Sequence, residues 1–117
     1  MNVVDSSGWL EYFADGPNAA VFAKPLQATS TLIIPSISLF EVFKRVMTQR
    51  GEDIALEAVA MMRQGRVVPL DDALALDAAR LSVEHRLPMA DSIILATALA
   101  HRATLWTQDA DFENVRG

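Results

Sequence analysis

Short apolar runs alternate along the chain with longer segments in which apolar residues recur at helical spacing. The short runs are rich in β-branched side chains and end in turn or polar residues, which is typical of buried strands. They cover residues 3–4, 31–34, 67–68 and 104–107. Strands that alternate with helices predict an α/β fold, a three-layer αβα sandwich around a parallel sheet of four or five strands. Only four such runs are visible, and a fifth strand is expected to be short or missing, because the chain stops at residues 114–117, soon after the last run.

The longer segments predict helices. They cover residues 6–13, 19–26, 52–64 and 90–101, with a long helix that ends at Gly51 and another that begins at Asp71 or Asp72 and ends before Leu87-Pro88. Ser6 or Ser7 is expected to cap the first of these helices. In the helix that ends at Gly51, the spacing of Leu39, Phe43 and Val46 predicts the face that packs in the core.

Composition narrows the class of protein. With 117 residues, of which 51% are hydrophobic, the chain is expected to bury one core and to form one domain over residues 1–117. It has no cysteine, which excludes a thiolate nucleophile, a disulfide and a cysteine-based zinc site. The formal charge of −5 argues against nucleic-acid binding by bulk positive charge, so a bound cation or a local basic strip would have to compensate.

The sequence shows neither the pattern of a secretory signal nor that of a membrane-spanning helix. The first residues carry no basic segment followed by a long apolar one, as a secretory signal would. The longest uncharged stretch, residues 25–40, is interrupted by two prolines and several hydroxyl side chains, whereas a spanning helix needs about 20 mostly apolar residues. We therefore expect a cytoplasmic protein with no membrane partner.

Acidic residues follow or lie near the predicted strand ends. Asp5 follows the first strand, Glu41 lies early in the helix after the second, Asp91 opens the most apolar helix, and Asp109 and Asp111 follow the last strand. In open α/β sheets, the binding crevice lies outside the carboxyl ends of the strands, so these acids are expected to converge at one rim. Carboxylate oxygens suit a hard divalent cation such as Mg²⁺ or Mn²⁺.

Each acid also has a structural interpretation. Asp5 and Asp91 have the positions of helix caps, and Asp109 with Asp111 fits an Asx turn. Glu41 completes a capping-box pattern that starts at Ser38, and an ion pair with Arg45 is possible four residues on. Capping does not explain convergence, however. Two carboxylates about 4 Å apart repel by about 4 kcal/mol at an effective dielectric constant near 20, and a cation reverses the sign of that interaction.

Four segments of the sequence resemble the signature segments of PIN-domain ribonucleases, and most closely those of VapC-type toxins of toxin–antitoxin pairs. They are Val3-Val4-Asp5-Ser6-Ser7, Ser38-Leu39-Phe40-Glu41-Val42, the segment 87–98 around Asp91, and Leu105-Trp106-Thr107-Gln108-Asp109-Ala110-Asp111-Phe112. They span nearly the whole chain in the family's order. The resemblance implies the sheet-and-helix sandwich expected above, with a final strand that is short or missing here.

The resemblance also implies an activity and its residues. Asp5, Glu41, Asp91 and Asp109 correspond to the family's acidic metal-binding cluster, and Asp111 to a frequent additional acid. Thr107 matches a hydroxyl residue before the last acid, and Ser6 is expected to support the site with it. The implied function is a Mg²⁺- or Mn²⁺-dependent endoribonuclease that hydrolyses RNA phosphodiesters as the toxin of a type II pair. Its implied partners are RNA, a cognate antitoxin whose tail covers the active groove, and a second copy of the chain.

Alternatives remain open on the sequence alone. Lys44 and Arg45, one turn past Glu41, are candidates for contacts with the RNA backbone, but they equally suit a solvated helix face. A non-catalytic interaction module of the same fold would need no metal. A phosphoacceptor receiver-type domain would need a lysine near its last strand, whereas the only lysines are Lys24 and Lys44.

Overall fold

A four-stranded parallel sheet forms the centre of the molecule, in the order β3-β2-β1-β4. This computed structural model describes residues 1–112, and the possible fifth strand in residues 114–117 lies outside them. The strands are β1 (Asn2–Val4), β2 (Leu32–Pro35), β3 (Arg66–Val68) and β4 (Thr104–Trp106). The register pairs Val3 with Ile33 on one side and with Leu105 on the other. The predicted α/β sandwich with a parallel sheet is confirmed.

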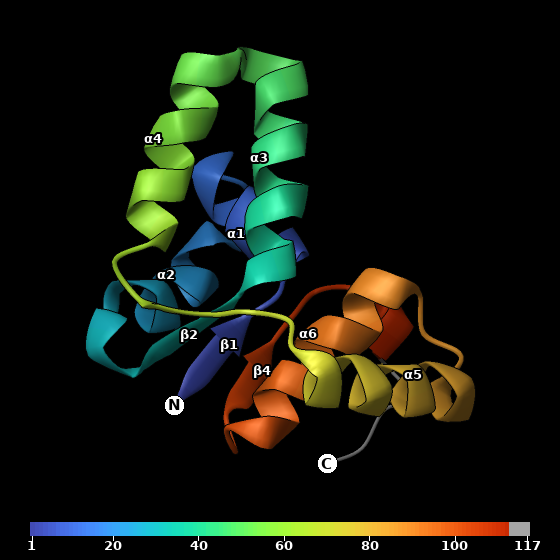
Figure 1. The fold of residues 1–117 in the computed structure, drawn as a ribbon. Coiled ribbons are helices and arrows are strands. Elements are labelled where there is room, and N and C mark those ends of the chain that lie inside the picture. The colour runs from blue at the N-terminus through green and yellow to red at the C-terminus, as the bar shows by residue number, and fades with distance from the viewer. Residues whose placement is uncertain (113–117) are drawn as a thin grey trace.

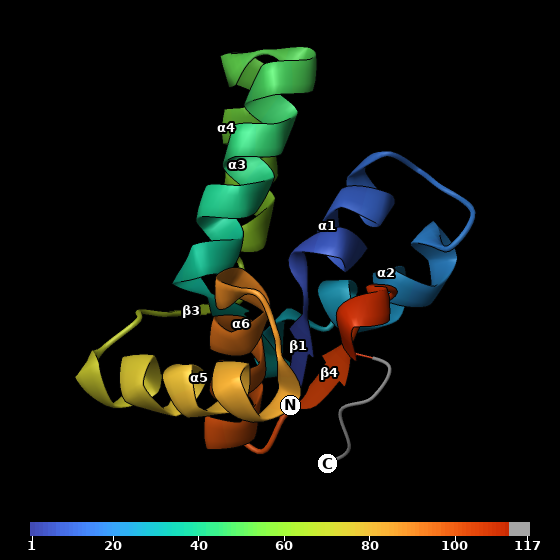
Figure 2. The same ribbon diagram turned by 90° about the vertical axis from the view of Figure 1, so that its right-hand side faces the viewer.

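Helices cover both faces of the sheet (Figures 1 and 2). They are α1 (Ser6–Phe13), α2 (Ala19–Gln27), α3 (Ser36–Arg50), α4 (Glu52–Met62), α5 (Asp72–His85) and α6 (Met89–Ala100), with short 3₁₀ turns at Thr29–Thr31 and Ala110–Phe112. Alternate strand residues serve opposite faces, because successive side chains of a strand point in opposite directions. Val4 and Ile34 pack with α1 to α4, whereas Val3 and Ile33 pack with α5 and α6.

Helices α3 and α4 form a hairpin that projects beyond the sheet (Figure 1). Gly51 joins them with φ of 92°, a left-handed conformation that glycine adopts without the steric cost of a Cβ. The lower part of the hairpin belongs to the core through Val42 and Val46 of α3 and Met62 of α4. The hairpin is therefore fixed at its base and stands beside α1, which leaves a space between them.

Two sequence predictions about helix ends and faces were wrong in detail. Asp5, not Ser6 or Ser7, is the N-cap of α1, because its side chain accepts a hydrogen bond from the Gly8 N–H. The α3 core face is Ser38, Val42 and Val46. Leu39 and Phe43 are only partly buried and pack against the edge of this core.

No helix within residues 1–112 is long and apolar enough to cross a membrane.

Candidate metal centre

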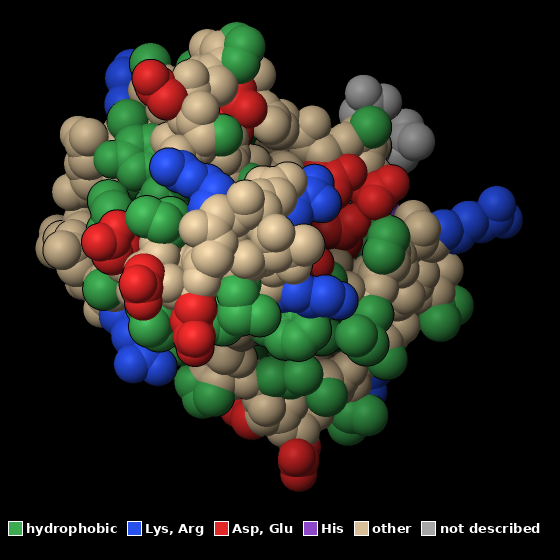
Figure 3. Space-filling model, turned by 90° about the horizontal axis from the view of Figure 1, so that it is seen from above, with side chains coloured by type: hydrophobic (Ala, Val, Ile, Leu, Met, Phe, Trp, Pro, Cys, Tyr) green, Lys and Arg blue, Asp and Glu red, His purple; other side chains and the backbone are tan. Residues whose placement is uncertain are grey.

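Acidic side chains from four parts of the chain meet at the end of the sheet where β1 and β4 finish. Asp5 directly follows β1, and Asp109 and Asp111 follow β4. Asp91 lies in the first turn of α6, and Glu41 lies in the second turn of α3. Figure 3 looks down on this end and shows acidic side chains gathered in one place, with Lys and Arg side chains beside them. The convergence expected from the strand ends is observed for Asp91, Asp109 and Asp111, whereas Asp5 and Glu41 lie close enough to interact electrostatically with this group.

The closest group consists of Asp91, Asp109 and Asp111. One carboxylate oxygen from each lies within 4.8 Å of the other two. The backbone N–H of Asp111 donates to Asp109 Oδ1 at 2.9 Å, so the predicted Asx-type bond between these two residues is present. The capping interpretation of Asp91 is wrong, because Pro88 is the N-cap of α6 and no side chain caps that helix. Asp91 therefore makes no capping hydrogen bond to its own helix.

Asp5 lies beneath this group and is almost completely buried, with 1% of its surface exposed. Its Oδ1 accepts hydrogen bonds from Ser7 Oγ at 2.7 Å and from the Gly8 N–H at 2.9 Å. Its Oδ2 accepts one bond, from Thr107 Oγ1 at 2.5 Å. A carboxylate offers about four lone-pair sites, so Oδ2 retains one for a further partner. Asp5 both caps α1 and presents an oxygen toward the β4 end.

Thr107 connects the buried Asp5 to the loop that carries the half-buried Asp109 and the exposed Asp111. Its hydroxyl donates to Asp5 and accepts the backbone N–H of Asp109 at 2.9 Å. A single side chain thereby fixes the Asp5 carboxylate and the start of the loop that carries Asp109 and Asp111. The supporting role that the resemblance implies for Thr107 stays a prediction, and these two hydrogen bonds are the contacts through which it would act.

Glu41 reaches the site from α3, and its charge acts on Asp91. Ser6 Oγ donates to Glu41 Oε1 at 2.6 Å, which ties α3 to the start of α1. The capping-box interpretation is wrong: α3 begins at Ser36, and the Ser38 hydroxyl has no hydrogen-bond partner among the described residues. The possible ion pair with Arg45 is also absent among residues 1–112. Glu41 is thus held by a hydroxyl and not neutralised by a cation.

Burial and mutual repulsion shift the titration of two acids. Loss of hydration raises the pKa of Asp91 to about 7, and the hydrogen bond with Asp111 and the charges of Asp109, Asp111 and Glu41 act in the same direction. Burial also raises the pKa of Asp5, and the charge of Asp109 adds to the increase. The bonds from Thr107, Ser7 and Gly8 partly offset that increase because they favour the ionised form.

The donor set fits a divalent cation of the Mg²⁺ or Mn²⁺ type. All its groups are carboxylate oxygens, which these hard ions prefer. No Lys, Arg or His forms an ion pair with any of the five acids within residues 1–112. Bringing such acids together is costly unless positive charge is supplied, and a bound cation between Asp91, Asp109 and Asp111 would supply it.

One supporting residue escaped the sequence analysis. Ser7 donates to Asp5, whereas only Ser6 had been predicted to support the site. A hydroxyl two residues after an N-cap acid can bond back to it, so the Asp-Ser-Ser order already contained this signal.

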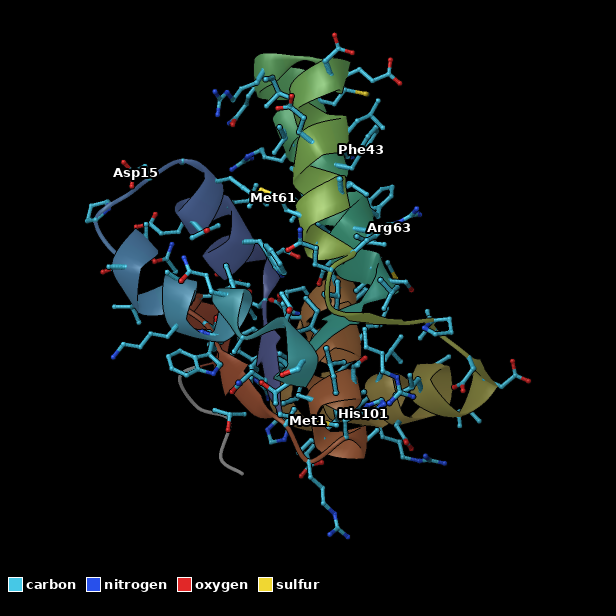
Figure 4. All side chains as sticks on the ribbon, turned by 90° about the vertical axis from the view of Figure 1, so that its left-hand side faces the viewer. Met1, Asp15, Phe43, Met61, Arg63 and His101 are labelled. Atoms are coloured by element: carbon cyan, nitrogen blue, oxygen red, sulfur yellow. The ribbon has the colours of Figure 1, made fainter. Side chains whose placement is uncertain are left out.

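The side chains of Lys44 and Arg45, the two candidate RNA-binding residues, lie in different surroundings. The Lys44 ammonium lies over the Phe40 ring, 5.6 Å from its centroid. Arg45 lines a cleft of about 750 Å³ between α1 and the α3–α4 hairpin. Ser7, which donates to Asp5, and Gln108, which precedes Asp109, also line the cleft, although none of the five acids does. Its apolar wall includes Leu10 and Met61, and Figure 4 shows Met61 extending from α4 toward α1.

One comparison with known proteins identifies a family, and another identifies a fold. The family model for the PIN domain matches residues 3–117. No curated protein matches the chain. A toxin–antitoxin complex from Klebsiella pneumoniae is similar in structure, with a TM-score of 0.80, 24% identity, and coverage of 98% of this chain and 92% of the other.

Two further solved structures have the same fold. The sarcin–ricin loop cleaving toxin VapC20 of Mycobacterium tuberculosis has a TM-score of 0.80 and 18% identity, covering 96% of this chain and 92% of its own. VapBC2 from Rickettsia felis, bound to a DNA fragment from its promoter, has a TM-score of 0.76 and 16% identity, covering 97% and 92%. At these identities, the similarity establishes the fold of the chain.

Proposed function

The chain belongs to the PIN domain family, and on that premise we propose that it is a divalent-metal-dependent endoribonuclease and the toxin of a type II toxin–antitoxin pair. The observation that carries this proposal is the approach of the Asp91, Asp109 and Asp111 oxygens to within 4.8 Å of one another. The structural similarity to toxins and toxin–antitoxin complexes supports it. Residues 1–117 are proposed to form a single PIN-like nuclease domain.

The acidic residues of the site would have different roles in the reaction. Asp91, Asp109, Asp111 and the free lone pair of Asp5 Oδ2 would hold Mg²⁺ or Mn²⁺. When bound, such an ion polarises a phosphoryl oxygen and lowers the pKa of bound water. Glu41, held by Ser6, would bind metal or orient the attacking water. With the ion bound, an acidic site can accept an anionic substrate. A non-catalytic interaction module of the same fold would not need a metal site.

The products of cleavage test the reaction. Attack by water, not by the ribose 2′-hydroxyl, leaves a 5′-phosphate and a 3′-hydroxyl. RNA incubated with the purified chain and Mn²⁺ should yield fragments that accept a ligated adaptor at their 5′-phosphate without prior phosphorylation. Fragments with 2′,3′-cyclic phosphates, or intact RNA, would contradict the proposal.

Thr107 variants should separate positioning from direct metal binding. Thr107→Val removes the hydroxyl that joins Asp5 to the Asp109 backbone, while Thr107→Ser keeps it. Partners of metal ligands typically contribute about 10- to 100-fold in affinity or activity. We expect Thr107→Val to lower kcat/KM and weaken Mn²⁺ binding by such a factor, and Thr107→Ser to stay near wild type. Equal losses in both variants would show that the hydroxyl bridge is not what the site needs.

Arg45 and Lys44 should differ in their effect on RNA binding. Arg45 lines the cleft beside the acids, whereas Lys44 lies over Phe40. In an inactive background, Arg45→Ala should reduce the slope of log affinity against log salt by about 1, the value for one lost phosphate contact. Lys44→Ala serves as the matched control and should change that slope less. Fluorescence anisotropy across a salt series measures both, and identical slopes for all three proteins would rule out the Arg45 contact.

The cleft and the apolar surface suggest two protein partners. We place a segment of the cognate antitoxin in the cleft, where its side chains would pack on Leu10 and Met61 and its backbone would pass Arg45 near the acids. Such a segment would block access of RNA to the site. A second copy of the chain is proposed as the other partner.

A further inference from the structure

Phe40 on α3 is the only exposed aromatic side chain within residues 1–112, with 60% of its surface open to solvent. The core face of α3 consists of Ser38, Val42 and Val46. Phe40 is two residues from both Ser38 and Val42, which places it about 160° around the helix from each of them. The Phe40 ring therefore lies on the opposite side of α3 and contributes little to the core.

Phe40 directly precedes Glu41, the residue that α3 contributes to the site. The charge of Glu41 acts on Asp91. Neighbouring residues of a helix differ in height by only about 1.5 Å, so the Phe40 ring lies beside Glu41 at almost the same height on α3. Figure 3 shows hydrophobic side chains and Lys or Arg side chains next to the acidic group at this end of the molecule. An RNA strand with a phosphodiester at the acids would thus pass close to the ring.

Lys44 places a positive charge on this ring. Its ammonium group lies 5.6 Å from the centroid of the Phe40 ring, in a cation–π arrangement. Lys44 forms no ion pair with a carboxylate within residues 1–112. The ring is 60% exposed with Lys44 in place, so open aromatic surface remains for a ligand. A flat aromatic face beside an unpaired cation complements a nucleotide, which offers a flat base and a negative phosphate.

We infer that Phe40 is a stacking platform for one unpaired base of the RNA, next to the phosphodiester that is cleaved. The inference rests on the proposed function and deepens it, since it names a side chain that would position the substrate. Unpaired bases can splay out and stack on aromatic side chains, whereas bases within a duplex remain stacked on their neighbours. Because every base has a π face, this contact would tolerate any base at that position.

Variants of Phe40 test the contact through RNA binding. Phe40→Leu keeps an apolar side chain that suits a helix but removes the π face, and Phe40→Trp enlarges that face. Both variants should fold, because the ring lies outside the core. They are measured in the inactive Asp5→Asn chain with Mn²⁺, by fluorescence anisotropy of a labelled single-stranded RNA of about ten nucleotides. Phe40→Leu should raise the dissociation constant by about 5- to 150-fold, and Phe40→Trp should leave it unchanged or lower it.

The dependence of binding on salt and a second variant provide controls. Phe40→Leu should leave the slope of log affinity against log salt unchanged, because it removes no phosphate contact. Met47→Ala is the matched variant, since Met47 is 43% exposed and lies on nearly the same side of α3, two turns nearer the tip of the hairpin. It should bind RNA like the Asp5→Asn chain. Equal losses in Met47→Ala and Phe40→Leu, or no loss in Phe40→Leu, would overturn the inference.

An oligomer without bases tests whether the ring contacts a base. Stable abasic nucleotides keep the phosphates of the RNA and remove every π face. The Asp5→Asn chain should bind an abasic oligomer of the same length more weakly than RNA, and Phe40→Leu should weaken that binding no further. This double-mutant cycle isolates the contact between the ring and a base. Equal losses of affinity for RNA and for the abasic oligomer in Phe40→Leu would show that the ring does not stack on a base.

These measurements fail separately from the proposed function, because binding is measured in a chain that does not cleave. RNA cleavage by the wild-type chain, together with unchanged RNA affinity of Phe40→Leu, would reject the stacking contact and leave the nuclease proposal intact. Base-dependent binding that Phe40→Leu removes, in a protein whose wild-type form does not cleave RNA, would support the stacking contact and reject the nuclease.

Discussion

Removal of divalent cations is expected to abolish RNA cleavage by the chain, and addition of Mn²⁺ after removal of EDTA should restore it. Asp91, Asp109 and Asp111 converge without a cationic side chain to neutralise them within residues 1–112. Without an added ion, the site would repel a phosphodiester. The measurement is the rate of cleavage of a labelled RNA before and after chelation and after addition of Mn²⁺. Circular dichroism of the chelated protein should show that its fold persists.

The same ion should stabilise the protein in a pH-dependent way. Because the pKa of Asp91 is raised to about 7, its ionisation destabilises the folded chain progressively as the pH rises from near 4 toward 7. Bound Mn²⁺ removes that repulsion, but at lower pH it must displace a proton from Asp91. The increase in Tm caused by Mn²⁺ should therefore be larger at pH 8 than at pH 6.

Two outcomes would contradict the metal site. Cleavage that persists in excess EDTA would show that catalysis needs no divalent ion. A thermal shift with Mn²⁺ that is equal at both pH values would show that the ion binds away from Asp91. Ca²⁺ offers a useful comparison, because its preference for more ligands and longer distances makes it a weaker fit to a small carboxylate group.

Asp5→Asn should lower the rate of RNA cleavage by about 100-fold or more, while the protein remains folded. The substitution takes away the negative charge that faces the metal group but changes the side-chain volume very little. The Asn Oδ1 can still accept the Gly8 N–H and the Ser7 hydroxyl, so the α1 cap survives. The Asn Nδ2 can donate to Thr107 Oγ1, provided that the threonine hydrogen turns away.

Asp5→Asn should also leave the thermal stability of the metal-free protein unchanged or raise it. Burial raises the pKa of Asp5, which means that its ionised form is disfavoured in the folded chain. In metal-free buffer near pH 7, a neutral Asn should therefore leave the Tm unchanged or raise it. The exposed Asp53→Asn on α4 is the control and should change neither cleavage nor Tm appreciably. A loss of cleavage accompanied by unfolding of Asp5→Asn would assign Asp5 to structure and not to the site.

Much of the fold could be predicted because its signals are local. Alternation of side chains along a strand sends Val3 and Val4 to opposite faces of the sheet whatever the rest of the chain does. Detailed helix ends were less predictable, as α3 shows by beginning at Ser36 and not at Ser38. A serine near a helix start satisfies the capping pattern, but α3 begins directly after Pro35, the last residue of β2 and the N-cap of the helix.

The sequence by itself determined which acids could meet, because residues that follow parallel strands share one edge of the sheet. Only the tertiary structure decided how they meet. The Thr107 bridge to Asp5 and the Ser6 bond to Glu41 join residues that are distant in the chain. The raised pKa of Asp91 depends on burial and on charges from α3 and the β4 loop. Such properties depend on strand register and helix packing. Both result from many weak contacts between distant residues, which a local sequence pattern does not reveal.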